Sequence, residues 1–132
     1  MPDQFDKQDY PCQDLTEQII GCALAVHREF GPGLLESIYE EALTIEMASA
    51  GLPFVRQVEL FLSYKGQPLA SRYKVDMVVD DKVVLELKTV EAILPVHAAQ
   101  LLSYMKLGGW RIGLLLNFKS ALMRDGVRRM VV

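Results

Sequence analysis

The sequence predicts a single α/β domain in which the elements follow the order ααβββαβ(β). Three observations predict this class. The chain has 132 residues, which is the size of one ordinary domain. Its composition, 51% apolar and 23% charged, is typical of a folded protein rather than a disordered one. The spacing of apolar residues changes along the chain between the helical period and the strand period. We expect an N-terminal arm over residues 1–13 and the domain over residues 14–132.

Two helices open the predicted domain. In the first, apolar residues recur at spacings of three or four: Leu15, Ile19, Cys22, Val26 and Phe30. Asp14 and Glu17 indicate an N-terminal cap, and the Gly31-Pro32-Gly33 segment ends the helix. A second helix is expected from Leu34 to Ala50, before a stop at Gly51, and one of its faces carries Leu35, Ile38, Ala42 and Ile45.

Strands and a third helix follow. Three strands are predicted as a meander over residues 54–64, 72–79 and 83–89, with a turn over residues 65–68. Pro95 opens a helix that ends at Gly108-Gly109. Residues 112–118 form a nearly unbroken apolar run, which is typical of a central strand covered on both faces, and residues 127–132 are a candidate edge strand.

Charge and composition limit the functional classes. The net charge of −3 does not favour a strong non-specific nucleic-acid binder. Residues 1–100 carry 8 basic and 16 acidic side chains, whereas residues 101–132 carry 6 basic and 1 acidic. The late basic residues form either a patch or an ordinary solvated surface: Lys106, Arg111, Lys119, Arg124, Arg128 and Arg129. No apolar run reaches the ~20 residues of a membrane-spanning helix, and the N-terminus is not that of a secretory signal, so we expect a cytoplasmic protein with no membrane partner.

The sharpest local signal is the VxELK stretch that ends at Lys88. In a strand, Val84, Glu86 and Lys88 share one face, with Glu86 and Lys88 about 7 Å apart along the strand. Asp76 lies on the strand before it. A three-residue loop at Asp80-Asp81-Lys82 puts Asp76 opposite Glu86, whereas a two-residue loop puts it opposite Leu85.

Two carboxylates held this close repel each other, by up to about 4 kcal/mol at ~4 Å and an effective dielectric near ~20. A hard divalent cation such as Mg²⁺ offsets the repulsion, because it favours carboxylate, water and phosphate oxygens. Lys88 alone also offsets it, as an ordinary cross-strand salt bridge. The residues leave both interpretations open.

Further polar residues lie on the predicted helices. Glu36 is expected one turn inside the second helix, with Tyr39 on its stripe, and either a ligand role or a structural role at the helix start suits it. Gln100 and Tyr104 share one face of the third helix, with His97 three residues earlier. These three residues and Tyr39 are candidates for contact with a phosphate or a base of a substrate, although the polar edge of a packed helix is the more ordinary explanation for the three on the third helix.

The segment Gly33-Leu34-Leu35-Glu36-Ser37-Ile38-Tyr39 resembles the GxxExxY signature of a group of small bacterial and archaeal proteins, which look like members of the PD-(D/E)xK superfamily. The resemblance runs from about Asp14 to the C-terminus. It includes the GPGLLESIYEEAL segment, the Asp76 and Glu86-Leu87-Lys88 strands, the HAAQLLSY helix and the LLLNF strand.

This resemblance implies a restriction-endonuclease-like core, a mixed central sheet flanked by helices, and a nuclease that uses Mg²⁺ or Mn²⁺. It implies that Asp76, Glu86 and Glu36 hold the metal and that these residues with Lys88 carry the catalysis. Gln100 and Tyr104 resemble the QxxxY element of exonuclease-like branches. Val75 stands where the name-giving proline would be, but proline supplies no ligand.

Two other functions stay open. One is a module on the same fold that binds nucleic acid or a protein without cutting, which suits the acidic net charge. The other is a homo-oligomer that pairs through an exposed strand or an apolar helix face.

Overall fold

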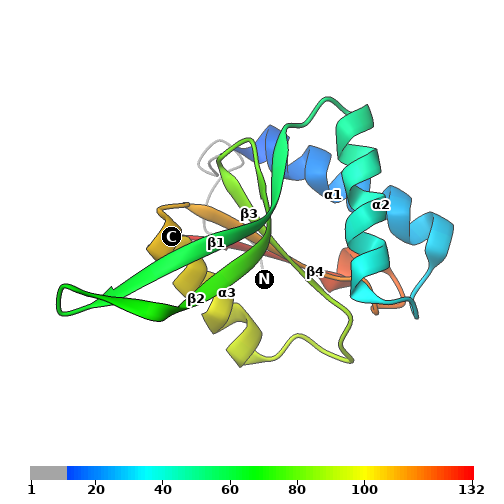
Figure 1. Ribbon diagram of the computed structural model, residues 1–132. Helices are drawn as coiled ribbons and strands as arrows, with labels where there is room; N and C mark the ends of the chain where they lie inside the picture. The colour runs from blue at the N-terminus through cyan, green and yellow to red at the C-terminus, as the bar shows by residue number, and fades with distance from the viewer. Residues whose placement is uncertain (1–11) are drawn as a thin grey trace.

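The computed structural model describes residues 12–132, which form a five-stranded mixed sheet between two helical layers (Figure 1). The elements are α1 (Gln13–Phe30), α2 (Glu36–Ser49), β1 (Phe54–Tyr64), β2 (Gln67–Val79), β3 (Val83–Lys88), α3 (Pro95–Gly108), β4 (Ile112–Asn117), η2 (Met123–Gly126) and β5 (Val127–Val131). The predicted class and element order are confirmed. The predicted arm lies outside the described residues except for Cys12 and Gln13, and Gln13 is already the first residue of α1. No helix among residues 12–132 is long and apolar enough to cross a membrane.

The sheet order is β1-β2-β3-β4-β5. β1, β2 and β3 pair antiparallel, β3 and β4 pair parallel through the α3 crossover, and β5 returns antiparallel to β4. Every residue of β4 is buried, as expected for a central strand with helices on both faces. The sheet therefore places the predicted site on β2 and β3, beside the most buried strand of the domain.

Each face of the sheet has its own hydrophobic core. One core lies under α1 and α2 and contains Ile19, Leu43 and Leu85. The other lies under α3 and contains Val84, Leu101, Met105 and Leu115. Leu85 and Val84 thus point to opposite sides, which confirms the alternation predicted for β3.

The starts and faces of the first two helices differ from the predictions. Cys12 occupies the N-cap of α1 without a side-chain hydrogen bond, and Asp14 lies inside the first turn, so the predicted Asp14 cap is wrong. In α2, Ile45 is 69% exposed, while Tyr39, Leu43 and Met47 are fully buried. The predicted aliphatic face is therefore not the buried one. Large side chains at spacings of four fill the α1–α2 core, and of the predicted stripe only Ala42 packs against it.

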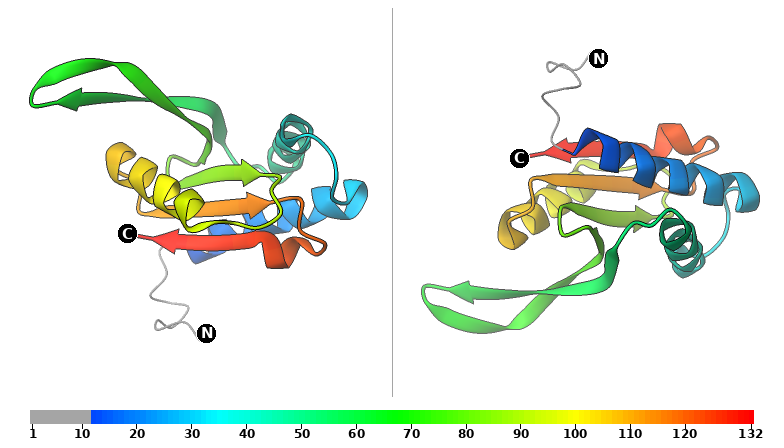
Figure 2. Two further views of the ribbon diagram at one scale, coloured as in Figure 1. Left: turned by 90° about the horizontal axis from the view of Figure 1, so that it is seen from below. Right: turned by 90° about the horizontal axis from the view of Figure 1, so that it is seen from above.

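The β1–β2 hairpin is longer than predicted. Its turn consists of Lys65 and Gly66, both at positive φ (49° and 78°), and β2 begins immediately at Gln67. The predicted strand started later because residues 67–71 are all exposed and show no apolar alternation. As a result, the hairpin reaches well beyond the other strands, as both views of Figure 2 show.

Candidate functional site

The β2–β3 connection has the three-residue form. Val79 pairs with Val83 and Met77 pairs with Leu85, with residues 80–82 as the loop between the strands. The same register places Asp76 opposite Glu86. Of the two registers that the sequence left open, the structure has the one that a shared carboxylate site requires.

The two carboxylates lie in the gap where β2 and β3 separate. The last ladder pair is Met77 with Leu85; beyond it, side chains replace backbone partners. The backbone N–H of Leu87 donates to Oδ2 of Asp76 at 2.8 Å, and the N–H of Asp76 donates to Oε1 of Glu86 at 3.0 Å. Each carboxylate is thus held by the main chain of the opposite strand, which fixes its position before any ligand arrives.

Burial and mutual repulsion shape the electrostatics of this gap. Glu86 is only 7% exposed, and burial followed by the negative charge of Asp76 raises its pKa to about 8, against the lowering effects of the Asp76 N–H and of Lys88. Burial is also the main cause that raises the pKa of Asp76, and burial with the Asp76 charge raises the pKa of Glu36. Three carboxyl groups therefore prefer their protonated form more than isolated carboxyls do. A cation in the gap would reverse this preference.

Lys88 lies two residues beyond Glu86 on the same strand. Its ammonium is close enough to lower the pKa values of Glu36, Asp76 and Glu86. Among residues 12–132, however, it has no carboxylate partner within the 4.0 Å of an ion pair. The simple cross-strand salt bridge, the alternative that the sequence left open, is not formed.

Glu36 and Tyr39 come from the start of α2. Glu36 is the first residue of the helix rather than one turn inside it. The hydroxyl of Tyr39 accepts a hydrogen bond from the N–H of Leu34 at 3.1 Å and donates one to the carbonyl of Gly31, while its ring stacks on Phe118 at 4.5 Å. Tyr39 is fully buried, so the prediction that it contacts substrate is wrong. It instead fixes the loop that delivers Glu36.

Two neighbouring residues of β1, Arg56 and Gln57, hydrogen-bond a buried glutamate of α2, an arrangement that the sequence did not predict. Glu40 of α2 is 8% exposed and accepts hydrogen bonds from Nε and Nη2 of Arg56, at 2.9 and 2.6 Å, and from Nε2 of Gln57 at 2.9 Å. The amide of Gln57 also lies close enough to Asp76 to lower the pKa of that carboxyl. Successive side chains of a regular strand point to opposite faces, yet Arg56 and Gln57 reach the same glutamate. The positive φ of Gln57, 50°, makes this arrangement possible.

The irregularity at Gln57 has a counterpart at Asp76. The two residues lie opposite each other, between the pairs Arg56–Met77 and Val58–Val75, and neither is in the ladder. On both strands the apolar side chains change faces here, because Phe54 and Met77 pack under α1 and α2 whereas Val58 and Val75 pack under α3. The site therefore lies at a paired kink, a feature for which the sequence pattern gives no signal.

The predicted α3 residues divide into two groups. Tyr104 lies beside the gap: burial and the charge of Glu86 raise its pKa, and its ring contacts that of Tyr73 at 5.0 Å. Gln100 is exposed one turn earlier on the same helix face. His97 accepts a hydrogen bond from the N–H of Leu94 on Nδ1 at 2.9 Å, so this nitrogen caps the helix and is not available to a substrate.

A comparison with protein families identifies the fold to which this geometry belongs. The sequence model of the PD-(D/E)XK nuclease superfamily matches residues 13–130. The chain belongs to the PD-(D/E)XK nuclease superfamily. Neither the comparison with curated proteins nor the comparison with solved structures found a match.

PD-(D/E)XK nucleases are typically metal-dependent, and the residues in the gap fit a magnesium ion in one specific way. Among residues 12–132, no three His, Cys, Asp or Glu side chains lie close enough to hold an ion unaided, so the predicted shell of Glu36, Asp76 and Glu86 is not preformed. Asp76 and Glu86 each use one oxygen for a backbone N–H and have a second one. Two carboxylates supplemented by water and phosphate oxygens are the usual environment of Mg²⁺.

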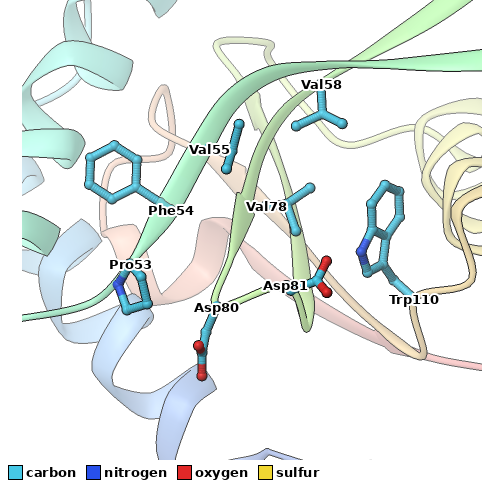
Figure 3. Close-up of a pocket in the computed structure, with 8 residues that line it drawn as sticks. All are labelled: Pro53, Phe54, Val55, Val58, Val78, Asp80, Asp81 and Trp110. Atoms are coloured by element: carbon cyan, nitrogen blue, oxygen red, sulfur yellow. The ribbon is translucent and has the colours of Figure 1, made fainter.

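The candidate site in the gap between β2 and β3 is separate from an apolar cavity of the domain. This cavity of about 420 Å³ lies between the start of the β1–β2 hairpin and the α3–β4 connection (Figure 3). It is lined by Pro53, Phe54, Val55, Val58, Val78, Asp80, Asp81 and Trp110. None of the candidate site residues lines it, so it does not form the substrate pocket of the gap.

Proposed function

We propose that this chain is a Mg²⁺- or Mn²⁺-dependent nuclease that hydrolyses phosphodiester bonds of nucleic acid. The observation that supports the proposal is the placement of Asp76 and Glu86, which oppose each other at the break between β2 and β3 with Lys88 two residues further along. A buried carboxyl group (Glu86) and a partly buried one (Asp76), both with raised pKa values and close to an ammonium, are chemistry that a structural role does not require.

The proposed roles follow from these positions. Asp76 and Glu86 would hold the metal with their second oxygens, and Glu36, at the start of α2, would be the third carboxylate near it. Magnesium bound there supplies a polarised phosphate and a water of lowered pKa. Lys88 orients the attacking water and stabilises the negative charge that develops on the phosphate oxygens. Gln100 and Tyr104 approach the substrate from α3.

We also propose that the chain belongs to the GxxExxY group. Each fixed position of that segment has a physical task here. Gly33 has a φ of 110°, which favours glycine, Glu36 opens α2 beside the gap, and the Tyr39 hydroxyl bonds both ends of the connecting loop. The fixed residues of the motif together position the carboxylate of Glu36.

Incubation of the purified chain with labelled single- and double-stranded DNA and RNA tests the proposed activity. We expect cleavage with Mn²⁺ and none with EDTA, and a loss of about a hundredfold or more in Lys88→Ala and in Glu86→Gln. The matched control is Lys82→Ala, since Lys82 pairs with Asp80 in the exposed β2–β3 loop. Equal cleavage by Lys88→Ala and wild type would remove Lys88 from the mechanism, and cleavage that ignores EDTA would contradict the metal-dependent reaction.

A further inference from the structure

The hairpin beyond the paired kink packs under α3 at its base and then extends away from the rest of the domain (Figure 2). We call residues 58–75 the β-arm. Its outer part projects away from the helices and the other strands (Figures 1 and 2). All of residues 67–74 are exposed. An isolated two-stranded ribbon is only marginally stable in water, so an extended one indicates a task other than building the core.

The β-arm exposes large aromatic and aliphatic side chains. Phe61 is 72% exposed, Tyr64 is 63% exposed, and Leu69 and Tyr73 are each 44% exposed. Several large exposed side chains on one element are typical of an interaction surface.

The charge of the β-arm is opposite to that of the surrounding sequence. It carries Lys65, Arg72 and Lys74 against the single acid Glu59, within a stretch of 100 residues that holds 8 basic and 16 acidic side chains. The guanidinium of Arg72 lies 4.8 Å from the centre of the Phe61 ring, and the ammonium of Lys65 lies 5.5 Å from that of Tyr64. The exposed rings of Phe61 and Tyr64 are thus each paired with a cation.

The base of the β-arm leads directly to the candidate site. Tyr73 contacts Tyr104, and the charges of Glu86 and Asp76 are close enough to raise the pKa of Tyr104. Asp76 immediately follows the last residue of the β-arm. A strand of nucleic acid held along the arm would therefore approach the gap between β2 and β3.

We propose that the β-arm is the binding element for single-stranded nucleic acid and guides it into the carboxylate gap. This inference rests on the proposed nuclease function and names its substrate class. Unpaired bases have free faces that stack on Phe61 and Tyr64, and the adjacent cations contact the phosphates. A duplex offers no free base faces except at its ends. The exposed rings of Phe61 and Tyr64 beside Lys65 and Arg72, the last also ion-paired with Glu59 at 3.1 Å, favour the single strand for that reason.

Fluorescence anisotropy of a labelled oligothymidine in EDTA tests the arm without cleavage. We expect Phe61→Ala/Tyr64→Ala to weaken binding by at least about fivefold. Lys65→Ala should lower the slope of log affinity against log salt by about 0.7 in magnitude. The matched control is Ile45→Ala/Leu122→Ala, which removes side chains that are 69% and 52% exposed outside the arm. All these positions are exposed, so the variants should fold, and circular dichroism verifies this.

The outcomes separate this inference from the nuclease proposal. Loss of single-strand binding in the arm variant, with the metal-induced thermal shift retained, supports the β-arm whether or not the chain cleaves. If the wild type cleaves and the arm variant binds and cleaves as the wild type does, the β-arm inference is overturned and the nuclease proposal stays intact. Absence of oligothymidine binding, tighter arm-dependent binding of a duplex, or an arm variant that changes only the oligomeric state would also overturn it.

Discussion

The carboxylates of Asp76 and Glu86 are each held by a backbone N–H of the opposite strand across the gap between β2 and β3. Glu86 accepts a hydrogen bond from the N–H of Asp76 at 3.0 Å, and Asp76 accepts one from the N–H of Leu87 at 2.8 Å. Because both bonds come from main chain, the carboxylates are positioned without a metal. The arrangement also concentrates negative charge in a buried place, which explains why the pKa of Glu86 rises to about 8.

The raised pKa of Glu86 predicts a pH-dependent stability in the absence of metal. The folded protein holds this proton up to about pH 8, whereas the unfolded chain releases it near the ordinary value of 4.5. The contribution of Glu86 to the free energy of unfolding is therefore greatest below pH 4.5 and falls as the pH rises towards 8. Urea unfolding in EDTA should show wild type losing stability relative to Glu86→Gln between these values. A difference that does not vary with pH would contradict the assigned environment.

Gln57 is predicted to position Asp76 through its amide. Gln57→Gly keeps the left-handed backbone but removes the amide that donates to Glu40 and lowers the pKa of Asp76, so the variant should fold and bind Mn²⁺ about 10- to 100-fold more weakly. Gln57→Ala removes the same amide but keeps a Cβ at the left-handed position, so it should be less stable than Gln57→Gly. Isothermal titration calorimetry measures the affinity. Wild-type affinity in Gln57→Gly would show that the amide has no such role.

Tyr39 is predicted to stabilise the loop before α2. Tyr39→Phe leaves the N–H of Leu34 and the carbonyl of Gly31 without their partner, which should cost about 1–3 kcal/mol of unfolding free energy. The control Tyr64→Phe alters a side chain that is 63% exposed and should change stability by less than about 0.5 kcal/mol. Chemical denaturation compares the two. Equal stability of both variants would argue against this role of the hydroxyl.

Much of the fold was predictable because apolar spacing reports strand faces and helix lengths. The alternation around Glu86 and the apolar run of β4 both matched the structure, since each reflects how one segment is buried. The buried face of α2 was not predictable, because the helix carries apolar residues on all its sides and only tertiary packing determines that the Tyr39 face is buried. The paired kink escaped prediction for a related reason: Gln57, at its positive φ, contacts Glu40 of the preceding helix, and such a tertiary contact leaves no local pattern in the sequence.

The placement of Asp76, Glu86 and Lys88 on two neighbouring strands was predictable, but their geometry was not. The spacing of Glu86 and Lys88 on one strand fixed their shared face, whereas the position of Asp76 depended on a loop whose length the sequence left open. The contribution of Glu40, Arg56 and Gln57 required the packing of α2 against β1. Side chains that act through other side chains leave no local pattern.

The most direct test of the carboxylate gap as a cation site is a thermal-shift titration with Mn²⁺ near pH 8. We predict that metal raises the melting temperature of wild type by several degrees and that Glu86→Gln abolishes the rise. Glu41→Gln, a control at an exposed glutamate of α2, should retain it. No rise at millimolar metal, or an equal rise in wild type and Glu86→Gln, would contradict it.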